Sequence, residues 1–167
     1  TPGAFQAAKS GQFNGYITRM PLSLTSITAS TFFGGAQGWD FVYGLNFDGE
    51  VIITGHTGSS SGFPITSGAY DTTYNSVYGP DGGDDVFVSR LSADLSTVLA
   101  STYLGGTGWD GGCKALAVDS FILVSGSVGG TGFPVTVGGW DTSYNDGTFK
   151  YSRDAFFTAL DRNLSRV

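Results

Sequence analysis

The chain is built from short runs of aromatic and β-branched residues, separated by turn-forming glycine, serine, aspartate and proline. Runs of this kind predict β-strands. The expected strands recur in four sets: 15–20, 86–91 and 155–160; 30–35 and 101–106; 41–47 and 113–118; and 50–57 and 121–128. Asp48-Gly49 predicts a hairpin turn between two of them. No useful length of chain places apolar residues at helical spacing, so essentially no helix is expected.

One segment occurs twice and indicates an internal duplication. Gly62–Asn75 returns as Gly132–Asn145, displaced by 70 positions, with nine of fourteen residues identical. Thr1–Phe5 matches the end of the same motif, as if from a third copy. Unrelated loops do not share this many positions in register, so the repeat organises the whole chain.

Four short strands in a repeat of about 70 residues are typical of one blade of a β-propeller. A parallel β-helix has a much shorter period, and an immunoglobulin-like sandwich does not normally carry a near-identical internal repeat. The predicted fold is therefore all-β, with four-stranded antiparallel blades of the β-propeller type. Residues 1–35 are expected to form the last two strands of a partial blade, 36–106 a full blade, and 107–167 a second blade whose last strand is truncated.

Two repeats cannot close a ring of six or seven blades alone. The expected partners are therefore other copies of the chain or further blades of a longer polypeptide. An open stack of sheets that pairs end to end is a third possibility, because uncovered edge strands accept additional strands.

A succession of motifs resembles a known repeat family. The motifs D-x-F-V-x-x-L, S-T-Y-L-G-G, A-x-A-V-D, V-x-G and G-F-P-x-T-x-G-A-Y stand at Asp85–Leu91, Ser101–Gly106, Ala115–Asp119, Val124–Gly126 and Gly62–Tyr70. Together they resemble the SBBP repeat, a seven-bladed β-propeller repeat of bacteria and archaea. The resemblance implies a surface or secreted propeller, usually part of a longer polypeptide, without family-defining catalytic residues. The first copy departs from it, with GLNFD where the family has A-x-A-V-D.

Composition narrows the range of partners. The 167 residues include 27 Gly, and the net charge is −6 with only eight basic residues. Without a basic stripe, nucleic acid is not an expected partner. No run of 18 apolar residues exists, so membrane insertion is not expected. The single Cys113 excludes an internal disulfide and predicts a buried, inert thiol, which together with the composition fits an extracellular or cell-surface location.

Residues that recur in each copy are expected to serve the fold. Four pairs of aspartates recur and predict turn-pinning acceptors of backbone N–H groups: Asp40 and Asp110, Asp48 and Asp119, Asp71 and Asp141, and Asp85 and Asp154. Trp39 and Trp109 also recur, which favours packing between blades. With Trp140, they are nonetheless the candidate residues for stacking on a glycan.

The residues unique to one copy are the other candidates for a site. Asp81, Asp84 and Asp85 lie close together in a glycine-rich loop, so calcium is a possible ligand there, against the alternative of a solvated turn. No other cofactor is expected. Asn163 begins an N-glycosylation sequon.

His56, the one histidine, ends a predicted strand where the other copy has Ser127, and no nucleophile motif accompanies it. A surface or turn histidine is expected, and no catalytic residue is predicted. The sequence thus favours a non-enzymatic extracellular scaffold or self-assembling surface element. A glycan- or protein-binding adhesion module is the alternative. A carbohydrate-active enzyme fragment is favoured less, because it needs carboxylates facing each other across a pocket.

Overall fold

The computed structural model describes residues 1–77, 83–145, 147 and 152–167, apart from the side chains of residues 112, 113 and 116–118. The prediction for the Cys113 thiol therefore lies outside the described residues. Among these residues the regular secondary structure consists of β-strands, without a helix. The strands are β1 (Gly15–Arg19), β2 (Ala29–Phe33), β3 (Asp40–Phe47), β4 (Val51–Thr57), β5 (Asp85–Leu91), β6 (Val98–Leu104), β7 (Gly111–Val118), β8 (Phe121–Val128) and β9 (Asp154–Asp161).

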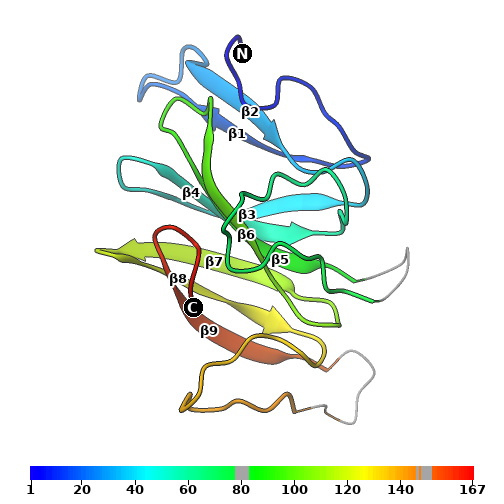
Figure 1. Cartoon of the computed structure of the whole chain (residues 1–167). Helices are drawn as coiled ribbons and strands as arrows, with labels where there is room; N and C mark the ends of the chain where they lie inside the picture. Colours follow the sequence, from blue (N-terminus) through cyan, green and yellow to red (C-terminus); the bar gives the residue numbers. More distant parts are fainter. Residues whose placement is uncertain (78–82, 146, 148–151) are drawn as a thin grey trace.

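The nine strands form three antiparallel sheets, which Figure 1 shows one above another. The first sheet is β1-β2, the middle sheet is β3-β4-β5-β6 and the third sheet is β7-β8-β9. All pairings are between neighbours in sequence, as expected of a meander. The predicted all-β, antiparallel fold is thus confirmed for the described residues, and the predicted strands are confirmed to within a few residues. Those residues also contain no helix long and apolar enough to cross a membrane.

Tight turns with left-handed backbone join the first two strands of the middle and third sheets. Gly49 has φ 96° in the β3–β4 connection, where Asp48-Gly49 predicted a hairpin. Asp119 has φ 49° in the two-residue turn between β7 and β8. Glycine takes this conformation freely and aspartate tolerates it, so both hairpins form where the sequence changes from apolar runs to these residues.

The central strands β4 and β5 of the middle sheet are buried on both faces. Every residue of β4 is buried, because successive side chains point to opposite faces and a neighbouring sheet covers each face. Ile53 belongs to the core shared with the first sheet, and Ile52 to the core shared with the third sheet. The first core includes Ile17, Phe33, Phe63, Phe87, Leu91, Leu95 and Tyr103. The second includes Val86, Val88, Leu104, Ile122, Val124, Leu160 and Leu164.

The two cores repeat the same packing. We call residues at equivalent positions of neighbouring repeats counterparts. Phe63 and Phe87 pack with ring centroids 5.0 Å apart in the first core. Their counterparts Phe133 and Phe156 lie 4.5 Å apart and pack against the second core. The repeated sequence therefore produces a repeated face-to-face interface.

Candidate functional site between the middle and third sheets

A buried histidine occupies the end of the middle sheet next to the third sheet. His56 on β4 is only 5% exposed and lies opposite Phe41 on β3 and Val86 on β5. Its Nε2 is 3.2 Å from the Tyr43 hydroxyl. Its Nδ1 is 3.0 Å from Asp84 Oδ2, within ion-pair distance but not aligned as a hydrogen bond. The prediction of a surface or turn histidine is therefore wrong.

His56 is buried because the third sheet packs against it. The pattern of strands within one repeat does not predict where the next sheet lies, so the sequence did not reveal this burial. The Trp109 ring packs edge-on against the imidazole, with centroids 5.1 Å apart. A Cβ at Gly111 would lie 3.0 Å from His56 Nδ1 and 2.7 Å from the Trp109 ring. Glycine at this position therefore makes room for both rings, and the Gly111-Gly112 pair is the available sequence signal.

Six rings follow one another from the meeting point of the first and middle sheets, across β3 and β4, to the boundary with the third sheet, and we call them the aromatic row. In order they are Trp39, Phe13, Phe41, Tyr43, His56 and Trp109, with successive centroids 5.5, 6.5, 6.0, 5.2 and 5.1 Å apart. At one end the Arg153 guanidinium lies 3.6 Å from the Trp109 centroid, a cation–π contact. Phe13, Trp39 and Tyr43 are each about half exposed. The row thus presents aromatic surface to solvent while its far end is packed.

The structure separates the three candidate tryptophans. Trp39 and Trp109 lie in the aromatic row, and Trp39 Nε1 donates to Gln12 Oε1 at 2.9 Å. Trp140 lies elsewhere, fully exposed on the loop that borders a cavity beside β9. A single ligand stacked on the row would therefore meet Trp39 but not Trp140.

The acidic residues of the proposed calcium loop diverge where they are described. Asp84 contacts His56, whereas Asp85 is buried and accepts the Asn75 N–H at 2.7 Å. Asp81 lies outside the described residues. Within the described part of the chain, no group of three or more His, Cys, Asp or Glu residues could hold a metal ion. Calcium binding by this loop stays a prediction.

Asp85 has an electrostatic environment of its own. Burial, together with the smaller effect of the Asp110 charge, raises its pKa to about 7, although the hydrogen bond from the Asn75 N–H acts to lower it. Its Oδ1 is buried without a hydrogen-bond partner among the described residues. The counterpart of Asp85 is Asn14, whose amide donates to Asp40, the counterpart of Asp110, at 2.9 Å. The interface of the first and middle sheets thus holds an amide–carboxylate pair, whereas the interface of the middle and third sheets holds two carboxyl groups.

Three of the four recurring aspartate pairs accept backbone N–H groups, as predicted. Asp40 accepts the Gly35 N–H at 2.8 Å, and Asp110 accepts the Gly106 N–H at 2.6 Å. Burial raises the pKa of both carboxyl groups. The same role is confirmed for Asp71, Asp141, Asp85 and Asp154, which accept N–H groups of Thr73, Ser143, Asn75 and Asn145.

The glycosylation sequon lies in a structured turn after β9. Asn163 is exposed, and Leu164 follows it with φ 55°. Ser165 donates its N–H and its hydroxyl to the Asp161 carboxylate, both at 2.8 Å. Glycosylation of Asn163 stays a prediction.

Comparisons of the chain with protein-family models, curated proteins and solved structures find no match. The resemblance to the SBBP repeat therefore stays a prediction that rests on the motifs of the chain itself.

The geometry around His56 favours positioning over proton transfer. Nε2 lies within hydrogen-bond distance of the Tyr43 hydroxyl, Nδ1 faces the Asp84 carboxylate without an aligned hydrogen bond, and the ring is buried. A general base must reach the proton that it removes. The accessible group of this cluster is Tyr43, which His56 holds within the aromatic row. The arrangement suits a surface for stacking.

Proposed function

We propose that the chain is a non-enzymatic scaffold of the propeller-repeat type, which extends by stacking further sheets on its two open faces. One observation carries this proposal: the outer sheets expose the positions whose counterparts are buried between sheets. The molecule therefore has, at its two ends, the two halves of an interface that it forms twice internally.

The free face of the first sheet carries one half of this interface. Tyr16 is 71% exposed, whereas its counterpart Phe87 is fully buried. Leu24 is 69% exposed, whereas Leu95 and Leu164, at the same position of the other repeats, are buried in the two cores. Exposed apolar side chains at interface positions mark a surface for association.

The backbone at Leu24 supports the same conclusion. Leu24, Leu95 and Leu164 have φ values of 55°, 61° and 55°, in the left-handed region that costs a leucine about 1–2 kcal/mol. Burial of the side chain offsets this strain at Leu95 and Leu164. At Leu24 nothing in the described chain covers the side chain, and a stacked sheet would supply that burial.

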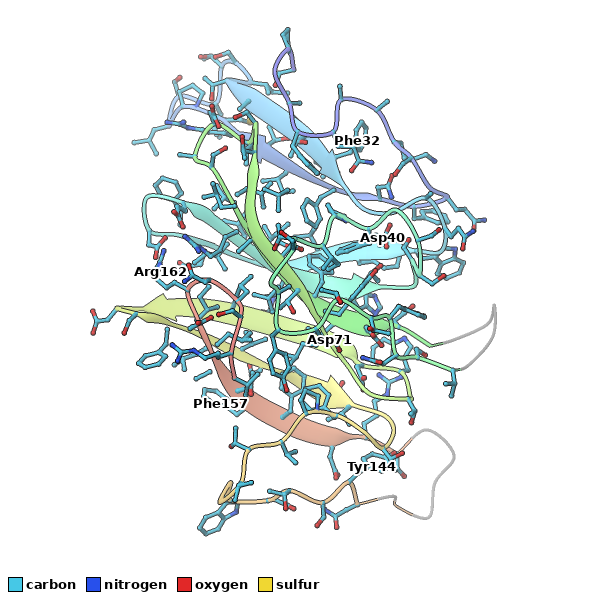
Figure 2. All side chains as sticks on the ribbon, in the orientation of Figure 1. Phe32, Asp40, Asp71, Tyr144, Phe157 and Arg162 are labelled. Carbon is cyan, nitrogen blue, oxygen red and sulfur yellow. The ribbon has the colours of Figure 1, made fainter. Side chains whose placement is uncertain are left out.

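The free face of the third sheet carries the other half. Phe157 is 75% exposed, whereas its counterpart Val88 is completely buried against the third sheet. Figure 2 shows Phe157 on β9, at the opposite end of the stack from the first sheet. Since the two open faces differ, association is head to tail and extends in one direction.

The partners are further copies of the chain or further blades of the same kind. An SBBP-like propeller outside the cell would use such stacking to form a rigid ring. The sparse charge and abundant glycine, serine and threonine are compatible with that location.

Light scattering tests the stacking of open faces. We expect the mass of the wild-type chain to rise with concentration and the single variants Leu24→Asn and Phe157→Asp to stay monomeric. Each variant keeps one intact face, so an equimolar mixture of the two should form a 1:1 dimer and no larger species. Val77→Asn replaces an exposed residue on a loop and should behave as wild type. A wild-type monomer at all concentrations would refute self-stacking.

The exposed part of the aromatic row favours a second candidate function, glycan binding. The C–H faces of a pyranose are apolar and pack on aromatic rings, and Trp39, Phe13 and Tyr43 present such rings along the row, with Phe41 between the last two. A glycan array followed by calorimetry tests this. Trp39→Ala should abolish binding, and Trp140→Ala, outside the row, should leave it unchanged. Equal effects of both substitutions would reject the row as the binding surface.

A further inference from the structure

A cavity of about 660 Å³ lies between β9 and the loop 130–145, at the edge of the third sheet, and we call it the slot. Figure 1 shows this loop running beside β9 at the end of the stack. No strand of the described residues pairs with the outer edge of β9. In the middle sheet, the equivalent space is filled by β6.

The hydrogen bonds that hold β6 define what such a slot recognises. β6 pairs with β5 on one side and is held by the segment 66–71 on the other. Thr66 Oγ1 accepts the Ser101 N–H at 3.0 Å and donates to the Ser101 carbonyl at 3.2 Å. Asp71 N–H donates to Thr102 Oγ1 at 2.9 Å, and the Asp71 carbonyl accepts the Tyr103 N–H at 3.1 Å. The segment 66–71 therefore binds the Thr102 hydroxyl directly and holds Ser101 through its backbone.

The first sheet repeats this pattern with a different strand. Thr1 Oγ1 accepts the Ser30 N–H at 3.0 Å and donates to the Ser30 carbonyl at 3.2 Å. Gln6 N–H donates to Thr31 Oγ1 at 2.9 Å, and its carbonyl accepts the Phe32 N–H at 3.0 Å. Two filled slots thus hold Ser-Thr-aromatic segments through the same bonds.

The loop that borders the empty slot already has the conformation of the filled ones. Gly138 has φ 82°, close to 79° at Gly68, and Gly139 N–H donates to the Thr136 carbonyl at 3.0 Å as in the other repeats. Asp141 accepts the Ser143 N–H at 2.9 Å, as Asp71 accepts its equivalent. Thr136 and Asp141 are therefore already positioned to bond with an added strand. Binding would not have to pay the entropy of ordering this loop.

On the β9 side, the slot offers a hydroxyl group as a partner for the added strand. A hydroxyl pair joins the strands in both filled sheets, Ser89 to Ser101 at 2.7 Å and Thr18 to Ser30 at 2.9 Å. Thr158 is the counterpart of Ser89 and lines the cavity. A serine of the added strand would thus find a hydroxyl partner on β9.

The slot also offers two aromatic rings against which the aromatic residue of the added strand can pack. In the middle sheet the Tyr103 ring packs against Phe63 and Tyr74, with centroids 5.6 and 6.1 Å apart. Their counterparts Phe133 and Tyr144 both line the cavity. Figure 2 shows Tyr144 at this end of the molecule, on the loop beside β9.

We propose that this slot binds an extended polypeptide segment of the sequence class Ser-Thr-aromatic-aliphatic-Gly-Gly, paired antiparallel to β9. The register follows from β5 and β6: the serine lies opposite Thr158, the threonine opposite Phe157 and the aromatic residue opposite Phe156. Binding occurs by addition of a strand to a sheet edge. The slot lies at the edge of the sheet and not on its face, so it does not depend on face-to-face stacking.

A synthetic peptide tests the slot directly. The peptide has the sequence of Val98–Gly106, VLASTYLGG, and its control has valine in place of the serine and threonine. The Leu24→Asn variant, in which face stacking is blocked at the other end of the molecule, provides a second protein background. We expect saturable 1:1 binding of the first peptide by calorimetry to wild type and to this variant, a change in Trp140 fluorescence, and slower hydrogen exchange of β9 amides. The control peptide should bind weakly or not at all.

Two protein variants locate the contact. Thr158→Val removes the hydroxyl partner and should weaken binding about threefold to tenfold, the effect of one neutral hydrogen bond. Thr25→Val, an exposed threonine in the first sheet's hairpin loop, should leave binding unchanged. Equal binding of the two peptides, an equal effect of the two substitutions, or no β9 protection would each overturn the proposal. So would no binding at all, whether or not the chain self-associates.

Discussion

At the scale of single residues, the two interfaces between sheets differ most at Asp85. The equivalent Asn14 donates a hydrogen bond to Asp40, whereas Asp85 brings a second carboxyl group next to Asp110. Burial raises the pKa of Asp85 from 3.8 to about 7. Between these pH values the folded chain holds a proton that the unfolded chain has released. The contribution of Asp85 to the free energy of unfolding therefore falls as the pH rises from about 4 to about 7, and is constant above that.

Asp85→Asn should remove this pH dependence. Asparagine restores the amide–carboxylate pair of the other interface, so the variant should match wild type near pH 4 and exceed it at pH 8 by roughly 2–4 kcal/mol. Urea unfolding at the two pH values measures the difference. Asp119→Asn, in an exposed turn, is the control and should show no such trend. A difference of the same size at both pH values would contradict the proposed titration of Asp85.

At the scale of strands and turns, much of the fold follows from the sequence. The β5 run DVFVSRL and its repeats are rich enough in aromatic and β-branched residues to predict strands, and Asp48-Gly49 predicts its hairpin. The segment Thr1–Phe5 was expected only as the end of a further repeat, and the sequence did not predict the bonds that Thr1 and the adjacent Gln6 make to β2. The burial of His56 was missed because it depends on a ring from the next sheet.

The role of Asp48 also depends on a distant element. The Asp48 carboxylate bonds with the Glu50 backbone in its own turn, as predicted, and it also pairs with Arg162 at 2.5 Å, in the turn after β9. That hydrogen bond lowers the pKa of Asp48. Glu50 accepts from both Arg90 and Arg162, and Arg90 in turn donates to the Arg162 carbonyl. Figure 2 shows Arg162 beside the middle sheet, so this charge network links two sheets that sequence pattern alone does not bring together.

Glu50→Gln should weaken the link between the middle and third sheets. The four side chains are 12–30% exposed, so the loss of the shared carboxylate should lower the free energy of unfolding by about 1–2 kcal/mol. The loss should shrink in about 1 M salt, which screens the charges. Arg166→Gln removes an ion pair of an 81% exposed side chain and should have almost no effect. Urea denaturation at low and high salt measures both variants, and equal losses would argue against the network.

At the scale of the whole molecule, stability depends on contacts between neighbouring sheets. The middle sheet has a neighbour on each face, and each outer sheet has one. A two-stranded sheet is not stable alone in water, so β1-β2 depends on the core that it shares with the middle sheet. Neighbouring residues of β4 face different cores, Ile53 toward the first sheet and Ile52 toward the third sheet. The strand thus offers a matched pair of sites for separating the two interfaces.

Ile53→Ala and Ile52→Ala should therefore loosen opposite ends of the molecule. Both side chains are completely buried, so each truncation should cost about 2–4 kcal/mol. Because local opening follows the weakened interface, Ile53→Ala should accelerate hydrogen exchange of β1 and β2 amides more than those of β8 and β9. Ile52→Ala should do the reverse. Native-state hydrogen exchange, resolved by residue, measures both patterns at a concentration where the chain is monomeric. Equal acceleration of all amides in both variants would mean that the three sheets open as one unit, and would contradict an interface-by-interface assembly.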